Sequence, residues 1–381
     1  MSIRCRDIIR VIEAWAEPSL AEEWDNVGLH VGDPEQPVER IMLALTPSEA
    51  AIAAAIEKQA DMLITHHPLL FKPIKAVTTQ SAVGRSIYQL VQNNVALYCA
   101  HTSLDAACGG VNDILAKVLG LENVRPLIPA EAFSPWYKLV VYVPEGYEEP
   151  VRQAICTAGA GQTEGFYDNC TFRAAGTGTF RPLAGATPFC GEVGKVDQVS
   201  EFRLETVVHQ AQLQAVLAAM QSAHPYEEVA YDLFRLAPSP QNAGMGRIGT
   251  LPQAVPLESF LARAAQALQS EDIVFCGDKK QRVQTVALCG GSGSSFMKEA
   301  QRAGADVYVT GDMKYHDGQL AKELGLAVID AGHFATERPI LSVMAEHLQQ
   351  MLGLRAEQVW VWQEEEDFLR QYHHSMEKGW E

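Results

Sequence analysis

Short apolar runs alternate with amphipathic segments along both outer thirds of the chain. The N-terminal third contains apolar runs of strand length at residues 41–46, 61–65 and 95–99. Between them, residues 48–58 and 82–93 carry apolar positions at helical spacing. A strand, a helix and a second strand in this order predict a β-α-β unit with parallel strands. Because the runs are almost wholly apolar, they indicate a sheet covered on both faces, as in an α/β fold.

The middle third has a different pattern. Its apolar segments between residues 137 and 236 follow the order β-α-β-β-α-β, which is typical of a ferredoxin-like fold. Two proline-bearing stretches flank it, RPLIPAEAFSPW at 125–136 and APSPQNAG at 237–244, and we interpret both as linkers. The pattern therefore predicts an inserted ferredoxin-like α+β module over residues 135–240.

The last third of the chain repeats the first. ADMLITHHPLL at residues 60–70 aligns with ADVYVTGDMKY at 305–315, and VALYCAHTSLD at 95–105 aligns with AVIDAGHFATE at 327–337. We therefore expect two related α/β lobes that face each other across a pseudo-twofold axis. The first lobe would span residues 1–130 and the second residues 248–370, and together they would form one metal-binding domain.

The composition of the chain indicates which classes of binding partner, and which cellular compartment, to expect. The net charge is -17 and the pI is about 5.1, with no stripe of lysine and arginine, which argues against a nucleic-acid partner. Eight cysteines lie scattered without a CxxC pair, as expected in a reducing compartment. No apolar run reaches the roughly 18 residues of a membrane span, and the first residues lack a signal-peptide core. We expect a cytoplasmic protein with no membrane partner.

Histidines and carboxylates gather where the predicted strands end. Two of the strands are followed by a His-x-x-x-acid pattern, and a third is followed by a double histidine. On a helix, a four-residue spacing places both side chains on one face, whereas adjacent residues on an extended segment point to opposite sides and can serve two ions. One such pair is often only a surface ion pair, but two aligned copies favour a metal site. The candidate ligands are His66, His67, His101, Asp105, His333 and Glu337.

The ligand types constrain the metal. Nitrogen and oxygen donors without sulfur suit two divalent ions such as Zn, Fe(II), Mn or Co, and they do not suit a structural thiolate zinc site. We therefore expect two divalent metal ions per chain. Whether they are catalytic or structural is left open by the donor types.

Further polar residues are candidates for substrate contacts. The sequence CGGSGSSF lies between a strand and a helix, so Gly291, Ser292 and Ser294 are candidates for a phosphate-binding loop. A tight turn is the alternative. His316 is a candidate acid/base group, because it lies near the second lobe's counterpart of the double histidine. In HPYEE, we interpret His224 as structural.

Asp25, Asn26 and His30 form a polar group in a turn-rich segment. They are either near the site or simply turn formers.

The motifs ITHHPLLFKP, AHTSLDAACGGVND, TGDMKYHD and DAGHFATE resemble those of the GTP cyclohydrolase I type 2-like family, also called the Nif-three-like dinuclear metal-centre family. The resemblance covers both outer thirds, and SAHPYEEVAYD resembles the extra module of the longer bacterial members. It implies that the six candidate ligands bind two metals. It also implies a homohexameric ring that encloses a cavity. The substrate that it implies is a small molecule or a nucleotide.

We expect a metal-dependent hydrolase. If the family name describes the reaction, a metal-activated water opens the imidazole ring of the GTP purine and His316 carries the proton. One alternative is a di-metal hydrolase of phosphoesters or other nucleotides. Another is a non-catalytic regulatory or scaffold protein whose inserted module senses a ligand.

Overall fold

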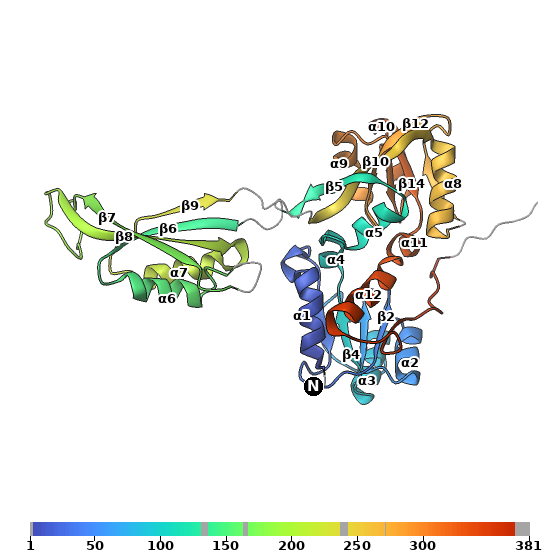
Figure 1. Ribbon diagram of the computed structural model, residues 1–381, viewed down its shortest axis with the longest axis horizontal. Coiled ribbons are helices and arrows are strands. Elements are labelled where there is room, and N and C mark those ends of the chain that lie inside the picture. The colour runs from blue at the N-terminus through green and yellow to red at the C-terminus, as the bar shows by residue number, and fades with distance from the viewer. Residues whose placement is uncertain (1–2, 131–135, 163–166, 237–242, 271, 370–381) are drawn as a thin grey trace, which may run out of the picture. The chain divides into compact units, whose positions relative to one another are not determined.

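The computed structural model in Figure 1 describes residues 3–130, 136–162, 167–236, 243–270 and 272–369. The chain divides into two compact units. One comprises Met1–Ala130 with Asn242–Glu381, and the other, the inserted unit, comprises Glu131–Gln241. In the described residues, no helix is both long enough and apolar enough to cross a membrane.

The first lobe is built on a five-stranded sheet. Its strands lie in the order β1 (Gly28–Val31), β4 (Ala96–Cys99), β3 (Met62–Thr65), β2 (Ile41–Ala44) and β15 (Val359–Val361). Strands β2, β3 and β4 are parallel and wholly buried. Residues of α1 (Cys5–Trp15) and α12 (Ile340–Leu352) pack in one core cluster with this sheet, and those of α2 (Glu49–Glu57) and α3 (Ala82–Gln92) pack in another. Apolar strands covered on both faces explain the continuous apolar runs.

The second lobe repeats this plan. Its sheet has the order β11 (Val274–Cys276), β14 (Ala327–Asp330), β13 (Val307–Thr310), β12 (Arg282–Leu288), β10 (Gly244–Pro256) and β5 (Glu122–Pro129). Three parallel strands correspond in the two lobes, β2, β3 and β4 in the first and β12, β13 and β14 in the second. Each set is followed at one side by an antiparallel strand, β1 or β11. The expected α/β fold of two related lobes is therefore confirmed.

Helices also cover the second sheet. Its two core clusters include residues of α5 (Val111–Val118) and α8 (Leu257–Leu268), and of α9 (Met297–Arg302) and α10 (Tyr315–Leu324). Short helices complete the two lobes: the 3-10 turns Pro18–Leu20 and Ser294–Phe296, α4 (Thr102–Ala106) and α11 (His333–Glu337).

The two lobes exchange elements, which the expected division at residues 1–130 and 248–370 did not anticipate. Helix α12 and strand β15 come from the C-terminal segment, yet they pack on the first lobe, where β15 pairs in parallel with β2 (Figure 1). Conversely, Leu115 and Ala116 of α5 lie in the core of the second lobe, and β5 joins its sheet. Each lobe is therefore completed by a segment that lies, along the sequence, on the other side of the inserted unit.

One of the expected linkers is wrong over part of its length. Residues 122–129 form β5, an edge strand antiparallel to β10, with Pro129 opposite Gly244. Proline is tolerated at a sheet edge because its missing N–H need not face a partner strand. The N–H of Ala130 donates to the carbonyl of Ala243 at 3.0 Å. Residues 131–135 and 237–242, which make up most of the rest of the two expected linkers, lie outside the described residues.

The inserted unit has its own four-stranded sheet. In chain order it contains β6 (Trp136–Pro144), α6 (Glu148–Thr157), β7 (Thr171–Phe180), β8 (Asp197–His209), the 3-10 turn Gln210–Gln212, α7 (Leu213–Ala223) and β9 (Tyr231–Arg235). The strand order is β7-β8-β6-β9, and all neighbours are antiparallel. Both helices pack on the sheet in a separate core cluster. This is the arrangement of a ferredoxin-like β-α-β-β-α-β unit.

Candidate metal centre

Strands from both sheets deliver the candidate ligands to one place. His66 and His67 directly follow β3, and His101 follows β4 as the residue before α4. His333 begins α11 after β14. In each one-turn helix the acid lies four residues after the histidine, so it turns back to the same side. The carboxyl ends of parallel strands are where α/β folds form their sites.

Glu337 lies at the middle of the cluster. Its Oε2 is 2.9 Å from Nε2 of His67 and 3.1 Å from Nε2 of His333. Its Oε1 is 3.7 Å from Nε2 of His66, which in turn lies 3.6 Å from Oδ1 of Asp105. The two oxygens of one carboxylate thus face different histidines.

Three overlapping groups in this cluster could each hold a metal ion, because their ligand atoms all lie within 4.8 Å of one another. These groups are His66 with His67 and His101, His67 with His333 and Glu337, and His66 with Asp105 and Glu337.

All four histidines are oriented by a hydrogen bond at Nδ1, which leaves Nε2 for the centre. Two of these bonds are made by carboxylates and two by neutral groups. The Nδ1 distances are 2.9 Å to the Ala100 carbonyl for His66, 2.9 Å to the Thr46 hydroxyl for His67, 2.8 Å to Asp25 for His101 and 2.7 Å to Asp312 for His333. Such outer partners fix the ring tautomer of metal-ligating histidines.

Two atoms of the cluster are buried without a hydrogen-bond partner. They are Nε2 of His66 and Oδ1 of Asp105. A buried polar atom without a partner is unfavourable by about 1–3 kcal/mol, so native structures rarely leave one. Both atoms are metal-ligand types and point into a cluster of further nitrogen and oxygen donors. The residues present therefore fit a divalent metal.

Glycines of the second lobe make room for this cluster. A Cβ at Gly291 would lie 2.0 Å from Oε1 of Glu337, and a Cβ at Gly311 would lie 2.8 Å from the backbone nitrogen of His333. Gly311 is the repeat counterpart of His66, so the second lobe has no space for a matching imidazole. This close approach explains why only one lobe carries a double histidine.

The metal-free cluster holds strongly perturbed groups. Burial acts to lower the pKa of His66, but the charges of Asp105 and Glu337 outweigh it and raise the pKa to about 9. Likewise Glu337 and Asp312 outweigh burial at His333 and raise its pKa to about 10. Burial raises the pKa of Asp105 to about 6. For Glu337 burial is opposed and exceeded by the neighbouring histidines, so its pKa lies well below the usual value.

Metal uptake at pH 7 is expected to release protons. With raised pKa values, His66 and His333 are protonated in the metal-free protein at this pH, whereas metal binding requires neutral imidazole. Calorimetric titration with zinc in two buffers of different ionisation enthalpy measures the number released. We expect one to two protons per chain at pH 7 and fewer at pH 10. A binding enthalpy that is the same in both buffers would contradict this.

Asp25 and Asp312 were not expected to orient ligands. Asp25 also accepts hydrogen bonds from the N–H and hydroxyl of Thr102 at 3.0 and 2.5 Å. Burial alone would raise the pKa of Asp25. The hydrogen bonds and His101 outweigh burial, so the pKa of Asp25 is lowered and the carboxylate stays ionised. Asp312 has a φ of 57°. In the sequence repeat it aligns with His67, and this alignment is the one signal by which its place near the metal centre could have been predicted.

Replacement of Asp25 by asparagine is expected to weaken metal binding about 10- to 100-fold, because second-sphere carboxylates have effects of this size. Competition with a chelator measures the affinity. Asp278→Asn is the matched control, because Asp278 is exposed and caps only a local turn. Equal affinities for both variants would show that Asp25 does not act on the metal.

The other polar residues of the turn-rich segment hold loops together. The side-chain amide of Asn26 donates to the Leu70 carbonyl at 2.6 Å, and the N–H of Leu70 donates to Nδ1 of His30 at 3.4 Å. This connects the segment before β1 to the segment after the double histidine.

Two glycine amides of the candidate phosphate loop are already hydrogen-bonded within the protein. The N–H of Gly291 donates to the Thr336 hydroxyl at 3.0 Å, and that of Gly293 donates to the Thr310 hydroxyl at 3.0 Å. Ser292 is exposed and Ser294 is half-buried in a 3-10 turn. The loop therefore packs against α11, and this favours the tight-turn alternative at Gly291.

His316 lies on α10 and is exposed. Its ring contacts Tyr315, and its Nδ1 is 3.5 Å from Oε1 of Gln319. These neighbours belong to its own helix, and neither is one of the six candidate ligands.

Comparison with known proteins identifies the family. The model of Duf34/NIF3 (NGG1p interacting factor 3) matches residues 3–367. The chain belongs to the Duf34/NIF3 family. The resemblance of the sequence motifs is thereby confirmed.

NIF3-family relatives match along most of their length. The GTP cyclohydrolase 1 type 2 homolog of Bacillus subtilis is 42% identical over 334 residues, which cover 88% of this chain and 89% of that protein. The homolog of Mycobacterium tuberculosis is 38% identical over 356 residues, covering 93% of each. The crystal structure of a Bacillus cereus protein related to NIF3 has a TM-score of 0.70 and 37% identity, covering 98% of this chain and all of that one.

Proposed function

We propose that the protein is a di-metal-dependent hydrolase that acts on a purine nucleotide. The observation that carries this proposal is the position of Glu337, whose two oxygens face separate histidines, so that this carboxylate would help to hold both ions. The buried and unpartnered atoms of His66 and Asp105 support the same conclusion. The names of the relatives, which describe them as homologs of a GTP cyclohydrolase, favour a nucleotide substrate.

When bound, two divalent ions supply Lewis-acid polarisation of the substrate and a water of lowered pKa. Zn, Fe(II), Mn and Co are the ions that the nitrogen and oxygen donors suit. The chain itself contributes four oriented imidazoles and two buried carboxylates. Asp25 and Asp312 keep the rings of His101 and His333 in the tautomer that presents Nε2.

Two exposed aromatic side chains supply a surface for a planar base. Trp24 is 57% exposed and Phe71 is 51% exposed, and their ring centroids are 5.7 Å apart. The ring of Trp24 also lies 6.0 Å from that of His101. Stacking on such a ring stabilises a bound base by about 1–3 kcal/mol. A purine stacked here would lie beside the candidate metal ligand His101.

The proposed reaction is hydrolytic ring opening. One water adds to the imidazole-ring carbon between the two purine nitrogens, and one carbon–nitrogen bond breaks. A second water then releases that carbon as formate. Transfer of the proton by His316 stays a prediction, because its described contacts lie within α10.

The experiment is incubation of the metal-loaded protein with GTP, ATP and phosphomonoesters, with formate, inorganic phosphate and purine absorbance measured. We expect formate from GTP, no formate from Glu337→Gln, and a KM raised about tenfold in Trp24→Ala. Phosphate release without ring opening would replace this reaction by phosphoester hydrolysis. No turnover of any compound would favour a non-catalytic regulatory or scaffold protein.

Self-association into a homohexamer also stays a prediction, and the family resemblance supports it. Light scattering of the purified protein measures the mass against 41.7 kDa for one chain.

A further inference from the structure

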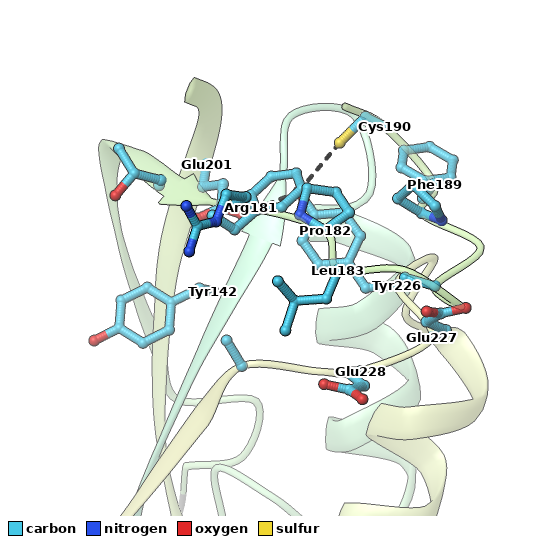
Figure 2. Close-up of a pocket in the computed structure, with 16 residues that line it drawn as sticks. Tyr142, Arg181, Pro182, Leu183, Phe189, Cys190, Glu201, Tyr226, Glu227 and Glu228 are labelled. Carbon is cyan, nitrogen blue, oxygen red and sulfur yellow. Dashed lines mark hydrogen bonds between the residues drawn. The ribbon is translucent and has the colours of Figure 1, made fainter. Parts of the chain in front are cut away.

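The inserted unit contains a cavity that the metal centre does not use. Its volume is about 530 Å³, which lies within the range of small-molecule sites. The walls come from the segment after β7, the turn before β9, and residues of β6 and β8. Figure 2 shows Leu183 between Tyr142 on one side and Glu227 and Glu228 on the other.

The HPYEE segment builds one wall of this cavity. The N–H of Tyr226 donates to Nδ1 of His224 at 3.1 Å, so Nε2 carries the proton and donates to the carbonyl of Tyr142 at 3.0 Å. Burial lowers the pKa of His224 and keeps it neutral. Both oxygens of Glu227 accept from the N–H of Thr187 at 3.1 Å. The segment therefore fixes the turn and holds the opposite loop.

Aromatic rings form a continuous apolar surface in the cavity. The centroid of Tyr226 lies 6.2 Å from that of Phe180 and 6.0 Å from that of Phe189. Phe189 and Leu183 are 49% and 65% exposed although they line the cavity. Large apolar side chains left this exposed around a cavity are typical of a surface that a ligand covers.

The charged groups of the lining are mainly carboxylates. Tyr226 donates to Oε1 of Glu201 at 3.0 Å, and a Cβ at Gly178 would lie 1.9 Å from Oε2, so this carboxylate occupies the space that a side chain at residue 178 would fill. Among the described residues, Glu228 has no hydrogen-bond or ion-pair partner for its side chain, and neither has Arg181. Three carboxylates and one guanidinium line the cavity.

This lining selects by charge and by shape. Excess negative charge disfavours a polyphosphate and favours a neutral or cationic ligand with N–H donors, which carboxylates accept. The aromatic surface favours a planar ring. We propose that this cavity binds a planar, amino-substituted nitrogen heterocycle of the nucleobase or nucleoside class. This site is additional to the proposed hydrolase centre and independent of its metals.

The test measures binding of guanosine to the full-length, metal-loaded protein by calorimetry. We expect saturable binding that Phe189→Ala and Glu228→Gln each weaken about tenfold or more. Inosine, which lacks the exocyclic amine, should bind about tenfold more weakly, because a charge-assisted hydrogen bond is lost. The matched controls are Phe172→Ala, an exposed phenylalanine of β7 outside the lining, and Glu145→Gln.

Glu337→Gln separates this proposal from the hydrolase. It disrupts the metal centre, so guanosine binding that persists in this variant supports a separate site. Absence of saturable guanosine binding, binding that Glu337→Gln abolishes, or equal affinity in the cavity and control variants would each overturn the proposal. Equal affinity for inosine would overturn recognition by the carboxylates. Thermal unfolding of each variant shows that the inserted unit remains folded.

Discussion

Replacement of Glu337 by glutamine is expected to lower affinity for the more weakly held metal by more than about 100-fold. The carboxylate is 3% exposed and faces His66 through one oxygen and His67 and His333 through the other. An amide keeps the shape but offers one weaker oxygen donor and no charge. The effect should exceed the 10- to 100-fold loss typical of second-sphere changes.

Metal content after dialysis against a chelator measures the outcome. The matched control is Glu346→Gln, because Glu346 is exposed on α12. We expect the control to retain two ions per chain and the Glu337 variant to retain one or none. Two ions retained with unchanged affinity would mean that Glu337 does not hold them.

Replacement of Arg247 by methionine is expected to destabilise the protein by about 3–5 kcal/mol, as when one partner of a buried ion pair is removed. Arg247 is wholly buried, and Asp113 accepts from its Nε and Nη2 at 2.6 and 2.8 Å. The carbonyls of Ala107, Gly244 and Gly246 accept the remaining hydrogen bonds. Each of these acceptors would lose its hydrogen bond from Arg247, although Asp113 and Ala107 would keep those from the N–H groups of Gly109 and Gly110.

Urea unfolding of the metal-free protein measures this loss. Arg302→Met is the control, because its guanidinium is exposed and forms only a local ion pair with Glu299. Such exposed pairs contribute about 0–1 kcal/mol. Arg247→Lys should also destabilise the protein, since one ammonium cannot reach acceptors on several sides. A loss below about 1 kcal/mol in Arg247→Met would contradict the assigned role.

The parts of the site that recur in the sequence were predictable. The two His-x-x-x-acid copies and the double histidine follow apolar runs, and the folded chain brings His66, His67, His101, Asp105, His333 and Glu337 together. Local spacing was sufficient for these residues because strand ends meet at one edge of each α/β sheet, and the repeat indicated that the two lobes face each other.

Residues that act over long sequence separations were not predictable. Asp25 contacts His101 across 76 residues, and Arg247 contacts Asp113 across 134. No periodicity connects such pairs. Strand β15 was not predictable either, because it is short and pairs through only three residues with β2, which lies far away in the sequence. The prolines of β5 concealed an edge strand, since the rule that places proline in loops also permits it at edges.

The antiparallel pairing of β5 with β10 has an evolutionary consequence. Pro129 lies opposite Gly244, so the segment between them replaces the tip of a β-hairpin. A chain can exchange such a tip for a whole folded unit because the cost of closing a longer loop grows only with the logarithm of its length. Acquisition, loss or replacement of the inserted unit would therefore need no change in the pairing of β5 with β10, and the two parts of the chain can diverge under separate selection.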